Sequence, residues 1–255
     1  MNHSPELVLS PTLARMAGVY ALSRAGGRNS PRFVSYRTQA EQHWGLAAFN
    51  PMAGDAAAAA VHALIALDAE DVAATAAKGA LALCDWHEVV TLAVVVATPG
   101  MWTDRLATEV RHRTNAARRD AHGEILVWAD DPPSVATIER ESIAEVVRTM
   151  WTSLHGSTGS LHAVLAREGM AYALAGTAPP PRPDRARVSE AIEVLGDTPA
   201  LGDIVAVLYG DAAAVTLGYT PLGLGDRAGY SFAIEEALES IAKFGAAGAI
   251  RRDRT

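Results

Sequence analysis

A short segment in the first fifth of the chain gathers side chains suited to proton transfer and anion binding. Residues 33–50 read FVSYRTQAEQHWGLAAFN and bring Arg37, Glu41 and His43 close together in sequence. Histidine can carry a proton near neutral pH, glutamate can orient it or act as a base, and the planar guanidinium of arginine can bind a carboxylate or phosphate. We therefore predict that these three residues are catalytic.

Two aromatic residues of the same segment are candidate substrate contacts. Tyr36 and Trp44 flank the three polar residues, and an aromatic ring offers a surface on which a flat ligand can stack. The competing interpretation is an exposed hairpin with ordinary polar residues, because such clusters are often solvated faces.

An arginine-rich segment, WTDRLATEVRHRTNAARR at residues 102–119, is the second candidate. Its arginines are Arg105, Arg111, Arg113, Arg118 and Arg119. It follows a predicted central strand, and ligands of open α/β sheets gather outside the carboxyl ends of strands. We take Arg105 and Arg111 as candidate phosphate contacts and Trp102 as a candidate substrate contact. The alternative is a helix whose charges form solvated ion pairs.

The sequence gives little sign of a metal site or of a disulfide. His87 begins a sequence like that of zinc proteases, but the second histidine would stand at position 91, which is Thr91. His155 and His162 are too far apart for a chelating pair on one helix. Cys84 is the single cysteine, so no internal disulfide can form and a reducing cytoplasm is the expected location.

Composition and hydropathy argue against a nucleic-acid-binding protein, a membrane protein and a secreted protein. The net charge of −7 and a pI near 5.6 argue against a nucleic-acid binder, which normally carries a basic balance. The apolar runs are shorter than the roughly 20 residues of a transmembrane helix. The first residues lack a basic stretch followed by an apolar one, so we expect no secretory signal and no membrane association.

Periodicity predicts helices alternating with a few buried strands, which indicates an α/β or α+β layered fold. Helices are predicted at residues 5–24, 56–67, 69–83, 102–120, 135–155, 161–174, 188–195 and 231–244. Strands are predicted at residues 33–36, 45–49, 89–98, 125–128 and 203–210. We expect one domain over residues 1–255, with a proline-rich internal loop at 179–183 and a flexible tail at 246–255.

Four segments between residues 33 and 210 resemble the FMN-dependent nitroreductase superfamily, in particular its azoline-dehydrogenase branch. They are GLAAFNP, HEVVTLAVVVAT, SLHAVLAREGMAYALAG and VSEAIEVLGDTPALGDIVAVLYG. The resemblance implies a three-layer sandwich with a central mixed sheet flanked by helices, and a homodimer with sites at the subunit interface. It also implies an oxidoreductase of small-molecule or peptide (secondary) metabolism.

The same resemblance implies FMN as the cofactor. Its phosphate would then be contacted by Arg32, Arg37, Arg105 or Arg111, and Trp44 would form a stacking wall. Hydride transfer would be the chemistry of the flavin, with His43 as the acid or base supplied by the protein.

Two further functions stay open at this point. One is a flavin-free cyclase, lyase or condensing enzyme, in which His43 and Glu41 move protons and Arg37 holds a carboxylate. Trp44 or Trp102 would then pack on an aromatic substrate. The other is a noncatalytic binding or scaffold subunit whose arginine-rich helix docks an acidic partner.

Overall fold

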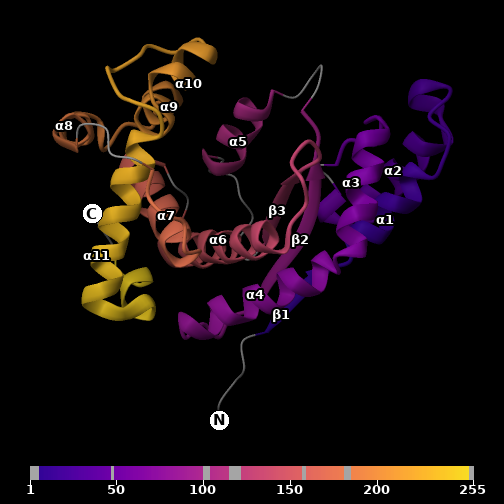
Figure 1. Ribbon diagram of the computed structural model, residues 1–255, viewed down its shortest axis with the longest axis horizontal. Coiled ribbons are helices and arrows are strands. Elements are labelled where there is room, and N and C mark those ends of the chain that lie inside the picture. The colour runs from indigo at the N-terminus through magenta and orange to yellow at the C-terminus, as the bar shows by residue number, and fades with distance from the viewer. Residues whose placement is uncertain are drawn as a thin grey trace. The chain divides into compact units, whose positions relative to one another are not determined.

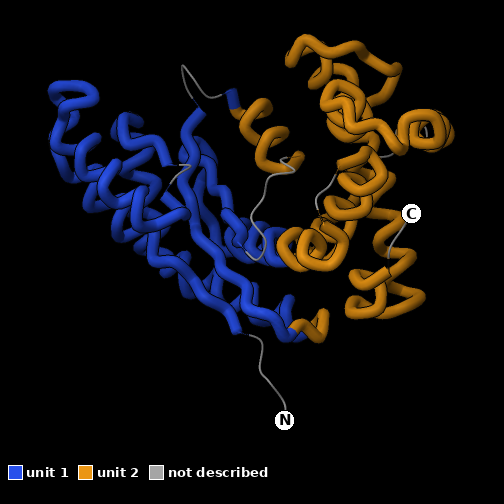
Figure 2. Tube along the Cα trace, turned by 180° about the vertical axis from the view of Figure 1, so that it is seen from behind, with its two compact units in different colours: residues 1–82, 87–104, 122–146 blue, residues 83–86, 105–121, 147–255 orange. Residues whose placement is uncertain are grey.

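A computed structural model describes the chain at residues 6–46, 49–99, 104–114, 122–156, 159–180 and 185–252. It is a mixed α/β protein with more helix than strand (Figure 1). The chain divides into two compact units (Figure 2). Unit 1 holds residues 1–82, 87–104 and 122–146, and unit 2 holds residues 83–86, 105–121 and 147–255. The single domain expected over residues 1–255 stays a prediction.

A parallel sheet of three strands forms the centre of unit 1. Its order is β1 (Leu7–Ser10), β2 (Val90–Ala97) and β3 (His122–Trp128). The register places Leu7 opposite Val90 and Ala97 opposite Trp128. The central strand β2 is buried along nearly its whole length, as expected of an apolar strand that is covered on both faces. This confirms the predicted strand at 89–98, whereas the predicted mixed sheet is wrong over the described residues.

The first strand replaces part of a predicted helix. Residues 5–24 were expected to be helical, but the helix α1 (Thr12–Tyr20) begins only after Pro11. The residue before a proline favours an extended backbone, so the chain stays extended up to Ser10. The carboxylate of Glu70 then accepts the Thr12 N–H at 2.7 Å and satisfies one of the free donors at the start of α1.

The segment expected to form two short strands is mostly helical. Helix α2 (Pro31–Gln42) starts with Ser30 as N-cap, whose Oγ accepts the N–H of Phe33 at 3.2 Å. A serine followed by proline at the first helical position is a typical helix start, and here it outweighs the strand preference of the aromatic residues. The predicted strand at 33–36 is wrong because these residues lie in α2. The predicted strand at 45–49 is wrong at residues 45 and 46, which belong to a 3-10 helix (Trp44–Leu46), while residues 47 and 48 lie outside the described part of the chain.

Several predicted helices are confirmed. Helix α3 (Asp55–Ala66) buries two alanines together with Val61 and Leu64, and helix α4 (Ala69–Leu83) buries a face made mainly of alanine. Helix α6 (Val135–His155) has the predicted bounds and contributes to both units, since residues up to 146 belong to unit 1 and later ones to unit 2. Helix α7 (Leu161–Leu174) also has the predicted bounds.

Unit 2 is helical in all its described regular elements. Besides α7 and the end of α6, it contains α5 (Arg105–Thr114), α8 (Arg185–Leu195), α9 (Leu201–Tyr209), α10 (Asp211–Thr216) and α11 (Ala228–Ile250). Helices α7 and α11 run side by side (Figure 1). Gly169 permits their close approach, because a Cβ there would lie 2.3 Å from the carbonyl oxygen of Ala233.

Helix α9 replaces the strand predicted at 203–210. Its apolar residues from Ile204 to Tyr209 are all buried in the core of unit 2. A short apolar run that is buried all round lacks the periodicity that separates a helix from a strand, which explains the error. The helix ends at Gly210, whose φ of 86° lies in a region that glycine adopts readily.

The C-terminal helix is longer than expected. Helix α11 continues past a non-helical Gly245 to Ile250, and Ala249 and Ile250 are buried. The flexible tail predicted from residue 246 is therefore wrong as far as residue 250. Residues 181–184 of the proline-rich loop and the last three residues of the tail lie outside the described part of the chain.

Candidate functional site

The three residues predicted to be catalytic lie on or next to α2 in unit 1. Arg37 and Glu41 are exposed on the helix, and His43, which is its C-cap, is half-buried. Within the described part of the chain, no hydrogen bond or ion pair joins any two of them. The structure therefore places them near one another without assembling an acid–base group, and their catalytic role stays a prediction.

The aromatic candidates beside them pack against other rings. Tyr36 lies 6.0 Å from the ring of Phe33 and 5.8 Å from that of Phe49, and burial raises the pKa of its phenol. Trp44 meets the ring of His122 edge to face at 5.1 Å. Both are half-buried, so their contacts within unit 1 already explain their positions.

Arg32 holds the end of α1. Its side chain is buried and donates to the carbonyl oxygens of Leu22 at 2.8 Å and Tyr20 at 2.6 Å. The guanidinium also lies 5.4 Å from the centre of the Tyr20 ring. Backbone carbonyls at a helix end need such donors, so this arginine has a structural task.

The candidate phosphate contacts on α5 lie in unit 2. Arg105 pairs with Glu109 one turn away at 3.2 Å, and the exposed Arg111 lies 3.4 Å from the hydroxyl of Thr108. Trp102 is outside the described residues. Arg32 and Arg37 belong to unit 1, whereas Arg105 and Arg111 belong to unit 2, and their role as phosphate contacts stays a prediction.

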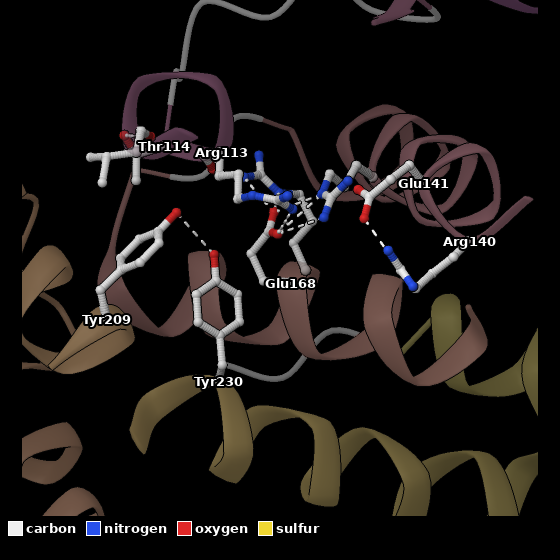
Figure 3. A network of polar contacts seen from close by, with 10 residues as sticks. Arg113, Thr114, Arg140, Glu141, Glu168, Tyr209 and Tyr230 are labelled. Atoms are coloured by element: carbon white, nitrogen blue, oxygen red, sulfur yellow. Dashed lines mark hydrogen bonds and ion pairs between the residues drawn. The ribbon is translucent and has the colours of Figure 1, made fainter. Parts of the chain in front are cut away.

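A different group of charged residues stands out in unit 2 (Figure 3). We call Arg113, Arg148, Arg167 and Glu168 the Arg–Glu cluster. The carboxylate of Glu168 accepts from Nε of Arg148 at 3.0 Å, from Nε of Arg167 at 3.1 Å and from Nη1 of Arg113 at 3.4 Å. The side chains of Arg148, Arg167 and Glu168 are 2%, 1% and 0% exposed, respectively, whereas that of Arg113 is 13% exposed.

Three helices supply the Arg–Glu cluster. Arg113 comes from α5, Arg148 from α6, and the neighbours Arg167 and Glu168 from the middle of α7. Arg167 also donates a hydrogen bond to the backbone carbonyl of Arg113, which lies near the end of α5. A cation at the carboxyl end of a helix is favourable because the helix dipole is negative there. The cluster therefore fastens α5 to α7.

Three tyrosines lie next to these charges. The guanidinium carbons of Arg113 and Arg148 lie 5.0 and 5.1 Å from the centre of the Tyr172 ring. The hydroxyls of Tyr209 and Tyr230 are 3.1 Å apart (Figure 3). Burial raises the pKa of Tyr209 to about 12 and that of Tyr230 well above its usual value. Both phenols are thus neutral at pH 7 and can act as hydrogen-bond donors.

The charges fix the ionisation of Glu168. Burial alone would raise the pKa of its carboxyl group, but the guanidiniums of Arg148, Arg167 and Arg113 outweigh that effect and hold the pKa well below its usual range. Glu168 therefore stays ionised at neutral pH and does not carry protons. The cluster is suited to holding an anion and to stabilising negative charge rather than to acid–base catalysis.

Other kinds of site have weaker support. No group of three His, Cys, Asp or Glu side chains in the described ranges could hold a metal ion. Cys84 is buried, and burial raises the pKa of its thiol to about 11, which makes it a poor nucleophile. Among the helices of the described residues, none has the length and apolar character needed to cross a membrane.

Sequence reasoning singled out Arg113 within the arginine-rich segment but missed its partners. The available signal was the dipeptide Arg167–Glu168, which stands among mainly apolar residues in the middle of α7. Charged residues at buried helical positions need partners, and this need could have suggested an internal ion pair.

Comparison of the chain with known proteins adds no relative. No protein-family model matches the sequence, and neither the curated proteins nor the solved structures contain a match. The resemblance to the nitroreductase superfamily accordingly stays a prediction, and the function must be argued from the side chains themselves.

Proposed function

We propose that the protein is an enzyme of small-molecule or peptide metabolism that recognises a carboxylate- or phosphate-bearing substrate through the Arg–Glu cluster of unit 2. The observation that supports this proposal is the gathering of three guanidiniums around one buried carboxylate. Burying an ion costs several kcal/mol, and apolar side chains of similar volume often stabilise a protein as well or better. Strongly perturbed ionisation also concentrates at functional sites.

The proposed role of the cluster is electrostatic. Planar guanidiniums bind carboxylates and phosphates through paired hydrogen bonds, and Glu168 orients them because it stays ionised. Neutral phenols such as Tyr209 can donate to an oxygen that gains negative charge. Glu168 stays ionised at neutral pH, so proton transfer would fall to other groups. This suits a flavin-free cyclase, lyase or condensing enzyme whose substrate carries an anionic group.

An FMN-dependent, nitroreductase-like oxidoreductase is the alternative that the sequence resemblance favours, together with a three-layer fold and a homodimer. The described residues do not fit FMN well. Arg32 is committed to the end of α1, and Arg105 is paired with Glu109. The amino end of α1, a common position for phosphate beside a parallel sheet, is occupied by the carboxylate of Glu70. We therefore derive no flavin step.

An absorbance spectrum separates these two proposals. The purified protein would be mixed with FMN and desalted, and the visible flavin band would be measured. The flavin-free proposal predicts no retained band, whereas stoichiometric FMN would favour the oxidoreductase.

The single cysteine and its buried, unreactive position support a cytoplasmic location as part of the proposal.

A noncatalytic subunit that binds an acidic partner would use the same arginines. The distinction is turnover, because such a subunit would bind carboxylates without converting any member of a substrate panel. Ligands that bind the folded state raise its melting temperature by mass action. We expect carboxylates and phosphorylated metabolites to raise the melting temperature of the wild type and of Arg111→Met, but not that of Arg113→Met. Equal responses of the two variants would contradict the proposed site.

A further inference from the structure

The three arginines of the Arg–Glu cluster differ in how firmly they hold Glu168. Arg148 and Arg167 approach its carboxylate to 3.0 and 3.1 Å and are almost completely buried. Arg113 approaches to 3.4 Å and keeps part of its side chain exposed. Hydrogen bonds weaken with distance and are screened near solvent. Among the three arginines, Arg113 is therefore the one whose contact with Glu168 an anion from solution can replace. Arg148 and Arg167 would continue to neutralise Glu168.

The docking of α5 depends on the contacts of Arg113. This helix has ten residues, and Val110 is its one buried residue. Isolated helices of fewer than about 12 residues are marginal in water, so α5 depends on contacts with its surroundings. Those contacts include Val110 in the core of unit 2, the hydrogen bond from Arg167 to the Arg113 carbonyl, and the ion pair of Arg113 with Glu168. Loss of the ion pair should loosen the helix.

The surroundings of Arg113 indicate what kind of anion would bind. Its guanidinium lies 5.0 Å from the centre of the half-buried Tyr172 ring. A carboxylate on a flat apolar group could pair with the guanidinium and place that group against the tyrosine ring.

We infer that the anionic group of the ligand binds the guanidinium of Arg113 beside Tyr172, replaces its contact with Glu168, and thereby loosens α5. This inference rests on the proposed function, because it assumes that the cluster recognises an anion. It assigns the contact with the ligand to one residue of the cluster and makes the docking of α5 dependent on the ligand.

Hydrogen exchange of the full-length protein tests the inference, with sodium benzoate as the probe and sodium chloride at equal ionic strength as the control. Saturating benzoate should speed amide exchange in residues 105–114 by roughly tenfold, the factor expected for losing one hydrogen bond between charged groups. Exchange in α7 should not change. Arg113→Met should show the faster exchange of α5 without benzoate, and the matched variant Arg111→Met should behave like the wild type.

Calorimetric titration of benzoate under the same conditions separates the two proposals. Binding without faster exchange of α5 would overturn the inference and leave the proposed function standing. Absence of both binding and faster exchange would overturn both. Equal acceleration by chloride would show ordinary screening of the ion pair and would also overturn the inference. If Arg113→Met does not fold, Arg113→Lys replaces it as the test variant. Lysine keeps the charge but lacks the planar fork of arginine, so we expect both the docking of α5 and the binding of benzoate to be weaker than in the wild type.

Discussion

Nε of Arg148 donates to the carboxylate of Glu168 over 3.0 Å, and this bond joins α6 to α7 inside unit 2. The two side chains are 2% and 0% exposed, so neither charge is solvated by bulk water. Each therefore depends on charged neighbours in the folded protein. This relationship underlies the stability and the proposed chemistry of the cluster.

Neutralising Glu168 should destabilise the protein strongly. We expect Glu168→Gln to lower the free energy of unfolding by about 3–5 kcal/mol, because it leaves buried guanidiniums without the carboxylate that they surround. Urea unfolding followed by circular dichroism measures the change. The exposed Glu193 provides a matched control, and Glu193→Gln should stay within about 0.5 kcal/mol of the wild type. Equal stability of the two variants would contradict the energetic importance of the cluster.

Stability should fall in acid through the same carboxylate. The pKa of Glu168 in the folded protein is held well below its usual range, whereas an unfolded glutamate has a pKa of about 4.3. Its stabilisation is therefore complete above that value and is lost as the pH falls below it. Urea midpoints of the wild type, measured from pH 6 down to pH 3, should decline more steeply than those of Glu168→Gln. Parallel curves would show that Glu168 is not held ionised.

The tyrosine pair predicts a loss of stability in alkali. Burial raises the pKa of Tyr209 to about 12, whereas an unfolded tyrosine has a pKa of about 10. The stabilisation is complete below the unfolded value and is lost as the pH rises from about 10 to about 12. Phenolate absorbance during alkaline titration should show one fewer late-titrating group in Tyr209→Phe. A phenolate that forms in the folded wild type near pH 10 would contradict the burial of this hydroxyl.

Two glycine substitutions should change stability in opposite directions. Gly169→Ala should lower the melting temperature, because its Cβ would lie 2.3 Å from the Ala233 carbonyl oxygen and would force α7 away from α11. Gly79→Ala in α4 meets nothing within 4 Å and should stabilise the helix by roughly 0.5–1 kcal/mol. Calorimetric melting of the two variants is the measurement. The same sign of change in both would contradict the close packing of α7 against α11.

Sequence patterns predicted the elements in which the spacing of apolar residues matches the face that the fold buries. Helices α4, α6 and α7 have the predicted bounds because their apolar residues recur at helical spacing. The apolar residues of β2 are largely β-branched, and such residues favour a buried strand, so its place in the sheet could be predicted. Helix α9 was mistaken for a strand because burial on all sides removes the periodicity that would have identified it.

The candidate site was harder to predict because its parts come from distant positions. Arg113, Arg148 and Glu168 lie on three helices, and no spacing in the sequence relates them. The segment around His43 attracted attention because its polar residues are neighbours in the chain. On α2, however, two of those residues are exposed and share no bond in the described structure. Tertiary packing, rather than local pattern, brings the charges of the Arg–Glu cluster together.

Recognition of an anion by the Arg–Glu cluster is tested most directly by a calorimetric titration of benzoate into the wild type, Arg113→Met and Arg111→Met. We expect saturable binding to the wild type, at least tenfold weaker binding to Arg113→Met because one charged hydrogen bond is lost, and unchanged binding to Arg111→Met. Undetectable binding to the wild type, or equal affinity in all three proteins, would contradict recognition of an anion by the Arg–Glu cluster.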